Sequence, residues 1–119
     1  MQSREYYLSK IQQEISTARE SVDAGNEGKA RVCARRAAGW AIQWFVSRNA
    51  RPDWRTDAMS QLRHLQGDES FPNDVHDAAR RLSARISDRF EYSPSADPIE
   101  DAILIINEIT RMLDRDVDR

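Results

Sequence analysis

Four cationic side chains lie close together in one alanine-rich segment and are the groups in this chain best suited to bind an anion. They are Lys29, Arg31, Arg35 and Arg36. On a helix, Arg31 and Arg35 would be one turn apart on a shared edge, where two guanidinium groups can clamp a phosphate. These four residues are therefore the candidate anion- or nucleic-acid-binding site.

The distribution of charge offers a second explanation for these cations. Residues 29–51 hold six cations and no acid, whereas residues 97–119 hold seven acids and three cations. Two neighbouring helices of opposite sign would pair these groups, and the net charge of -2 argues against bulk attraction to nucleic acid or to an anionic membrane. We favour this pairing for Arg31 and Arg35, and equally for Arg81 and Arg85, which repeat the spacing.

The sequence contains no recognisable catalytic or metal-binding constellation. Neither of the two histidines, His64 and His76, has a second histidine at ligand spacing. Cys33 is the only cysteine and lies among alanines, which predicts a small buried side chain and no internal disulfide. The segment GNEGKA at residues 25–30 lacks the spacing and the hydroxyl residue of a phosphate-binding loop, so it is predicted to be a turn between helices. We expect no catalytic residue, no metal and no cofactor.

Apolar residues recur at helical spacing through most of the chain, and strand alternation is almost absent. With 119 residues, of which 39% are hydrophobic, the chain is large enough for one core. These patterns predict an all-α fold, an up-and-down bundle of about five helices in a single domain over residues 1–119. Because we find no leader segment and no apolar run long enough to cross a bilayer, we expect a cytoplasmic protein without a membrane partner.

The first two helices are predicted to form a hairpin. Gly25 ends the first helix, and Asn26 caps a second helix that runs to about Arg48. One side of the second helix is predicted to face the core through Ala30, Cys33, Ala34, Ala37, Ala41, Trp44 and Phe45, with Trp40 at its boundary. The other side carries Val32, Gly39, Ile42 and Val46.

A helix that is apolar on two sides has two explanations. Either it is the central helix of the bundle, or Gly39 marks the crossing of two copies of this helix in a homodimer. Glycine inside a helix costs about 1 kcal/mol relative to alanine, so its presence indicates close packing in both cases. The possible dimer contact therefore comprises Val32, Gly39, Ile42 and Val46.

Three further helices follow. Pro52 and Asp53 are predicted to open a third helix with Trp54, Ala58, Leu62 and Leu65 on one side. Asn73 is predicted to cap a fourth helix that buries Val75, Ala79, Leu82, Ile86 and Phe90. The acidic cap and proline of DPIE at residues 97–100 open a last helix whose predicted core stripe is Ile99, Ala102, Ile103, Ile106, Ile109 and Leu113.

Residues 29–39 with the turn before them, the segment DPIEDA at residues 97–102 and the five-helix order together resemble the HEPN superfamily (higher eukaryotes and prokaryotes nucleotide-binding domain). The resemblance implies a helical bundle that commonly dimerises. Members serve as ribonucleases, as RNA-binding modules, or as partners of minimal nucleotidyltransferases in toxin–antitoxin and defence systems. The nuclease members carry an arginine followed after four to six residues by histidine, and no arginine stands at that distance before His64 or His76.

The sequence therefore predicts a non-catalytic HEPN-like domain, a homodimer that binds a partner protein, such as a nucleotidyltransferase, or a nucleotide-bearing ligand. Two alternatives remain. The first is an RNA-binding or degenerate ribonuclease protein of a toxin–antitoxin or defence system, using the cations at residues 29–36. The second is a structural interaction module whose arginines balance the acidic last helix.

Overall fold

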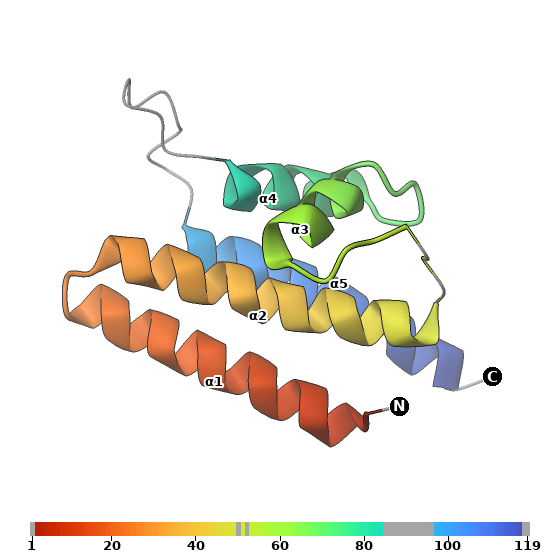
Figure 1. The fold of residues 1–119 in the computed structure, drawn as a ribbon, viewed down its shortest axis with the longest axis horizontal. Coiled ribbons are helices and arrows are strands. Elements are labelled where there is room, and N and C mark those ends of the chain that lie inside the picture. The colour runs from red at the N-terminus through yellow and green to blue at the C-terminus, as the bar shows by residue number, and fades with distance from the viewer. Residues whose placement is uncertain (1, 50, 52, 85–96, 118–119) are drawn as a thin grey trace.

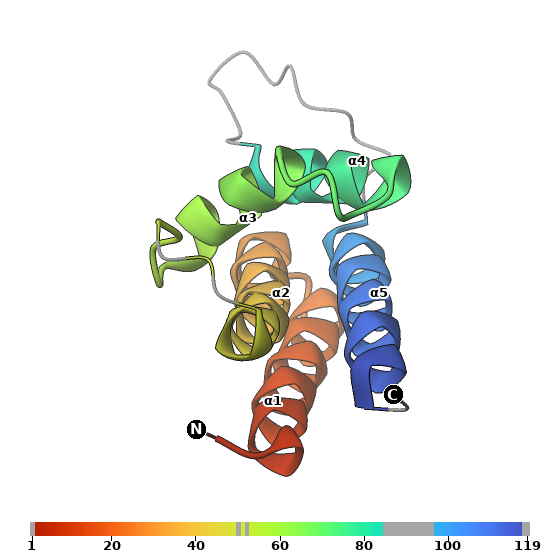
Figure 2. The same ribbon diagram turned by 90° about the vertical axis from the view of Figure 1, so that its right-hand side faces the viewer.

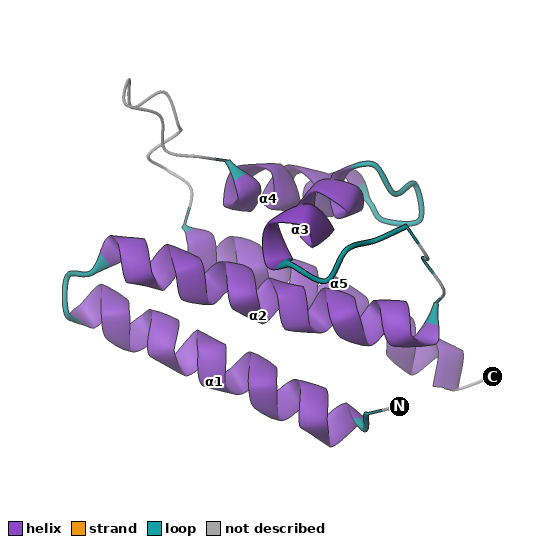
Figure 3. Ribbon diagram, in the orientation of Figure 1, coloured by secondary structure: helices purple, strands orange, loops and turns teal. Residues whose placement is uncertain are grey.

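The computed structural model describes residues 2–49, 51, 53–84 and 97–117 (Figure 1). These residues form helices joined by turns and loops, with no strand among them (Figure 3). The helices are α1 (Arg4–Asp23), α2 (Glu27–Arg48), α3 (Ala58–Gln66), α4 (Asn73–Ser83) and α5 (Pro98–Val117). The predicted all-α bundle of about five helices is confirmed. None of the described helices is long and apolar enough to cross a membrane.

Three long helices pack together, and two short ones lie across them on one side. Figure 2 shows α3 and α4 above α2 and α5, while α1 lies on the far side of α2. α1 is antiparallel to α2, whereas α5 runs in the same direction as α2, because the short α3 and α4 come between them in the chain (Figure 1). α2 contacts all four other helices and is the central helix of the bundle.

The predicted hairpin of α1 and α2 is confirmed. The helices are joined by a turn in which Gly25 takes a φ of 77°, a backbone conformation that glycine adopts without the strain of a side chain. The Asn26 side chain then caps α2 by accepting the Lys29 backbone N–H at 3.1 Å. Residues 25–30 are therefore a capped helix turn and not a phosphate-binding loop.

The core forms around α2. All seven residues predicted on its core-facing side are buried, and the predicted boundary position of Trp40 is also confirmed. Stacking of Tyr7 from α1 on Trp44, with ring centroids 6.1 Å apart, fills one end of the α1–α2 interface. Small alanines let α1 and α5 approach α2 closely along the rest of its length.

α3 begins later than the sequence predicts. The helix expected from residues 52–53 begins after Asp57, whose carboxylate accepts the Ser60 backbone N–H at 3.0 Å and so caps it. Trp54 precedes the helix and stacks from the loop on the His64 ring, with centroids 5.4 Å apart. Capping by Asp57, four residues beyond the predicted start, explains the difference.

α4 differs from the prediction at both ends. Asn73, predicted as its cap, is its first residue, and Pro72 occupies the cap position without a side-chain hydrogen bond. At the other end α4 stops before Ala84, whose backbone is extended with ψ 135°, so the helix is shorter than predicted. The predicted core residues Ile86 and Phe90 lie outside the described part of the chain.

The start of α5 is as predicted, and the buried face of this helix is wider than the predicted stripe. Asp97 Oδ1 accepts the backbone N–H groups of Ile99 at 2.9 Å and Glu100 at 3.3 Å. Ile105, which the prediction omitted, is fully buried, whereas Ile103 is only half-buried. The difference arises because α5 packs against α2 and α4 together and so buries more than one narrow stripe.

Candidate functional site

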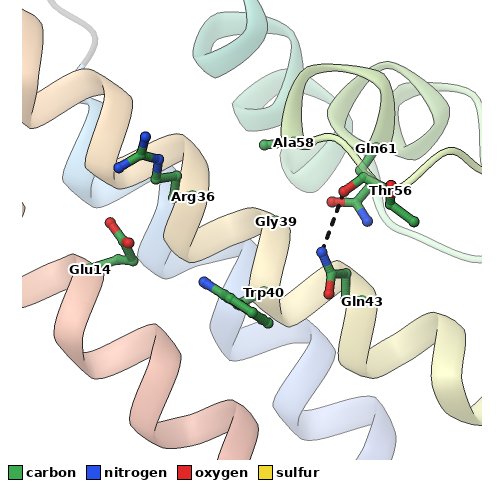
Figure 4. A pocket seen from close by; sticks show the side chains of 8 residues that line it. All are labelled: Glu14, Arg36, Gly39, Trp40, Gln43, Thr56, Ala58 and Gln61. Carbon is green, nitrogen blue, oxygen red and sulfur yellow. Dashed lines mark hydrogen bonds between the residues drawn. The ribbon is translucent and has the colours of Figure 1, made fainter.

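A cavity of about 320 Å³ opens on the side of α2 between α1 and the start of α3 (Figure 4). It is lined by Glu14, Arg36, Gly39, Trp40, Gln43, Thr56, Ala58 and Gln61, and we call it the α2 groove. Its volume falls at the lower end of the range of small-molecule sites, about 300–1,000 Å³. Charged, amide and aromatic groups converge in it, which makes it the candidate functional site.

The floor of the groove is one face of α2. Arg36, Gly39, Trp40 and Gln43 recur at spacings of three and four residues, so the helix presents them on the same side. Figure 4 shows the Arg36 and Gln43 side chains at opposite ends of this face, with Trp40 between them. α1 contributes Glu14 to one wall, and the residues at the start of α3 form the other wall.

Gly39 allows α3 to approach α2 at this point. A Cβ atom on residue 39 would stand 3.1 Å from Ala58 Cβ and 3.2 Å from Gln61 Oε1, which is closer than ordinary van der Waals contact. The close packing that the sequence predicts at Gly39 is therefore present within one chain. It brings the Gln61 amide of the α3 wall against the floor of the groove at Gly39.

Gln61 carries a buried acceptor without a partner. The residue is 2% exposed, and its Oε1 makes no hydrogen bond with any described residue. The other amide in the groove, Gln43, donates one Nε2 hydrogen to the Thr56 carbonyl oxygen at 3.3 Å and makes no hydrogen bond to Gln61 Oε1. A buried acceptor without a donor costs about 1–3 kcal/mol, so its presence calls for an explanation such as a ligand or an ordered water molecule.

The other end of the groove carries opposite charges. The Arg36 guanidinium is exposed and makes no hydrogen bond or ion pair with the residues that the structure describes. Glu14 lines the same end of the groove, and its carboxylate projects from α1 toward α2 near Arg36 (Figure 4). Arg36 is therefore free to meet an anion, while Glu14 limits the net charge at this end of the groove.

Trp40 forms the aromatic part of the floor and is held from the α1 side. Tyr6 meets it edge-to-face with centroids 5.9 Å apart, and Lys10 Nζ lies 5.8 Å from its ring centroid. These contacts fix the ring without covering it completely, since Trp40 remains half-buried. The ring is therefore available to a ligand in the groove.

The structure separates the four predicted anion-binding residues. Arg35 is engaged with the C-terminal end of α4, where its Nε donates to the Leu82 carbonyl oxygen at 2.7 Å and its Nη2 to the Ala84 carbonyl oxygen at 3.0 Å. Burial, and then the nearby Arg31 charge, lower the pKa of Arg35. Arg31 itself is only 7% exposed. Lys29 and Arg36 remain at the surface, and Arg36 alone of the four lines the groove.

The predicted pairing of cations with the last helix holds for Arg81. It forms a two-pronged ion pair with Asp101 of α5, through Nη2 to Oδ1 at 2.7 Å and Nε to both carboxylate oxygens at 3.2 Å. Arg35 instead meets backbone carbonyl groups, so the prediction that it pairs with an acid is wrong. Arg85 lies outside the described residues.

The four residues of the predicted dimer contact have different environments. Gly39 and Ile42 are buried within the chain, and Val46 is half-buried. Val32, which is 41% exposed, is the one that remains available to a second copy. The central position of α2 accounts for its two apolar sides, and the homodimer stays a prediction.

The two histidines and the cysteine do not line the α2 groove. His64 stacks on Trp54, and His76 Nε2 lies 2.7 Å from the Asp68 carbonyl oxygen. Burial, and then the nearby Glu14 carboxylate, raise the pKa of the Cys33 thiol, which disfavours the nucleophilic thiolate. Among the described residues, no three histidine, cysteine or acidic side chains are placed to hold a metal ion.

Sequence reasoning found Arg36 but not the groove around it. Glu14, Gln43, Thr56 and Gln61 come from four separate parts of the chain, and no spacing rule connects them. Gly39 was the available signal, because a glycine inside a helix marks a close approach. Comparison of this chain with protein-family models, with curated proteins and with solved structures finds no match.

Proposed function

We propose that this chain is a non-catalytic HEPN-like helical domain that binds a nucleotide-bearing ligand in the α2 groove. The supporting observation is the arrangement of three groups along one cavity. An exposed guanidinium, Arg36, lies at one end, the Trp40 ring lies in the middle, and the buried Gln61 amide lies at the other end. A nucleotide carries groups that complement all three, because it has a phosphate, a flat ring and a polar ring edge.

The contacts expected at Arg36 and Trp40 each contribute a typical amount to the free energy of binding. A charged guanidinium bonded to a phosphate contributes about 1.5–3 kcal/mol, and a base stacked on an aromatic side chain about 1–3 kcal/mol. These terms are partly offset by the cost of ordering the ligand and by repulsion between its phosphate and Glu14. We therefore expect binding in the micromolar to millimolar range, which suits a sensing or partner-docking role.

The absence of a catalytic role is also part of the proposal. The Cys33 thiol is buried, with its pKa raised. Neither histidine lines the groove. The RNA-binding alternative has less support, because Arg35 is engaged with α4 and Arg31 is buried. The partner protein, such as a nucleotidyltransferase, the homodimer and a toxin–antitoxin role remain predictions from the resemblance.

The test is calorimetric titration of the purified chain with AMP, GMP, CMP and UMP, each to millimolar concentration. We expect at least one to bind, and Arg36→Glu to weaken that binding about tenfold or more, since it replaces an attraction with a repulsion. Arg63→Glu is the matched control, because Arg63 is an exposed arginine that does not line the groove. If none of the four nucleotides binds, or if both variants weaken binding equally, the proposal is wrong.

A further inference from the structure

We infer that Gln61 Oε1 accepts a hydrogen bond from the bound ligand, so that the inner end of the α2 groove selects a ring that presents an N–H donor. This inference rests on the proposed function and names the feature of the ligand that the groove would recognise. It assigns Gln61 as a specificity-determining residue. Gln61 is the one side chain of the groove that is both buried and left with an unpartnered acceptor.

The unpartnered Gln61 Oε1 carries an energetic cost. An acceptor that is removed from water without a partner destabilises the fold, so a folded chain rarely keeps one unless another role requires it. Two other positions of α3 show the alternative, because Leu62 and Leu65 are fully buried apolar residues. A methionine or leucine at position 61 would fill similar space at no such cost.

Gln61 Oε1 lies where α3 approaches α2 closely in the groove. Gln61 lines the groove, and its Oε1 lies against Gly39, where α2 presents backbone without a side chain. Trp40, the next residue of α2, supplies an aromatic surface beside this point. A flat ring lying beside Trp40 and over Gly39 would bring its edge to Gln61 Oε1.

No described residue donates a hydrogen bond to Gln61 Oε1. Gln43 Nε2 donates one of its two N–H groups to the Thr56 carbonyl oxygen at 3.3 Å, and neither N–H group is bonded to Gln61. The Arg36 guanidinium lies at the far end of the groove, one helical turn from Gly39. Since none of the described residues supplies this donor, it is expected to come from a molecule that enters the groove, and a ligand N–H and a water molecule are the two sources to be distinguished.

The experiment compares each nucleotide with a matched ligand that lacks an N–H donor on its ring. Purine riboside 5′-monophosphate is matched to AMP and GMP, and pyrimidin-2-one riboside 5′-monophosphate to CMP and UMP. These ligands keep the phosphate and the ribose. We expect the ligand without the donor to bind about tenfold more weakly or worse, because it leaves the Gln61 oxygen unpaired in the complex.

Substitution of the acceptor should remove this discrimination. With Gln61→Met, we expect the nucleotide and its matched ligand to bind within about twofold of each other, because methionine has a similar length and no acceptor to leave unpaired. The melting temperature of the free variant should stay the same or rise. Gln66→Met is the control on the same helix, because Gln66 donates to Ser83 Oγ at 2.9 Å outside the groove, and it should leave the discrimination unchanged.

The outcomes separate this inference from the proposed function. If nucleotides bind and depend on Arg36, but the matched ligands bind equally well, a water molecule satisfies Gln61 and only the inference is wrong. If no nucleotide binds, the inference and the proposed function are both wrong. If Gln61→Met lowers the melting temperature by more than about 4 °C and leaves the discrimination intact, Gln61 is a structural residue and the inference is overturned.

Discussion

Arg35 and Arg36 are neighbours of the same type with opposite expected roles, and substituting each of them tests the structure directly. Arg35 donates to two carbonyl oxygens at the end of α4, at 2.7 Å and 3.0 Å, whereas Arg36 is exposed in the α2 groove. We consider Arg35→Met and Arg36→Met, because methionine retains most of the aliphatic stem and removes the charge and the donors.

The stability that Arg35→Met is expected to lose follows from the two hydrogen bonds of Arg35. Each bond from a charged donor to a carbonyl contributes about 1.5–3 kcal/mol, and the loss of both leaves the Leu82 and Ala84 carbonyl groups without this partner. Burial of the Arg35 guanidinium, which lowers its pKa, opposes part of that gain. We therefore expect Arg35→Met to lower the free energy of unfolding by about 2 kcal/mol, or the melting temperature by about 8 °C.

Urea unfolding followed by circular dichroism measures this difference, with melting curves as a second readout. Arg36→Met should stay within about 0.5 kcal/mol of the parent chain, as is usual for exposed positions. Arg35→Lys should be intermediate, because a single ammonium group cannot reproduce the two-pronged contact. If Arg35→Met and Arg36→Met are equally stable, the contact between Arg35 and the end of α4 does not hold the fold.

Three further predictions concern other parts of the bundle. Asp101→Asn should lower the melting temperature by about 4–8 °C, because it breaks the ion pair of the buried Asp101 with the half-buried Arg81, whereas Asp77→Asn, in an exposed pair, should change it by less than about 2 °C. Burial raises the pKa of Asp68, but hydrogen bonds to its carboxylate outweigh burial and lower the pKa overall. The stability that the parent chain has over Asp68→Asn should therefore be present above about pH 4 and disappear as the pH falls further, which acid unfolding of the two proteins would show. Alkylation of the buried Cys33 thiol by iodoacetamide should be about a hundredfold slower in buffer than in urea, and equal rates would contradict its burial.

Local signals in the sequence predicted much of the fold. The turn at Gly25, the cap at Asn26 and the acidic cap at Asp97 depend on a few adjacent residues and are found as predicted. The core-facing side of α2 also follows from helical spacing alone. These features were predictable because each is determined within a few turns of one helix.

The start of α3 and the end of α4 depend on interactions that the sequence does not reveal. Asp57 caps α3 in place of the predicted start at residues 52–53, and the packing of Trp54 from the loop on His64 accompanies this later start. α4 ends where Arg35 meets its terminal carbonyl groups, and that arginine lies 47 residues away from Leu82. Long-range contacts of this kind cannot be found from local propensity.

The α2 groove was not predictable for the same reason. Glu14, Trp40 and Gln61 come together only after α1 and α3 have packed against α2. The sequence showed that Gly39 permits a close approach, but not which segment would approach. That signal was compatible with an intramolecular contact and with a homodimer, and the position of α3 shows that the intramolecular contact is present.

Binding of a nucleotide in the α2 groove is the central claim, and the indole N–H signals of the three tryptophans test it most directly. A ¹H–¹⁵N correlation spectrum of the labelled chain, titrated with AMP, GMP, CMP or UMP, reports on Trp40 in the groove, Trp44 in the core and Trp54 beside His64. We predict that the Trp40 signal shifts with saturation and that the other two stay in place. A titration in which Trp40 does not move, or in which Trp54 moves alone, would contradict the proposal.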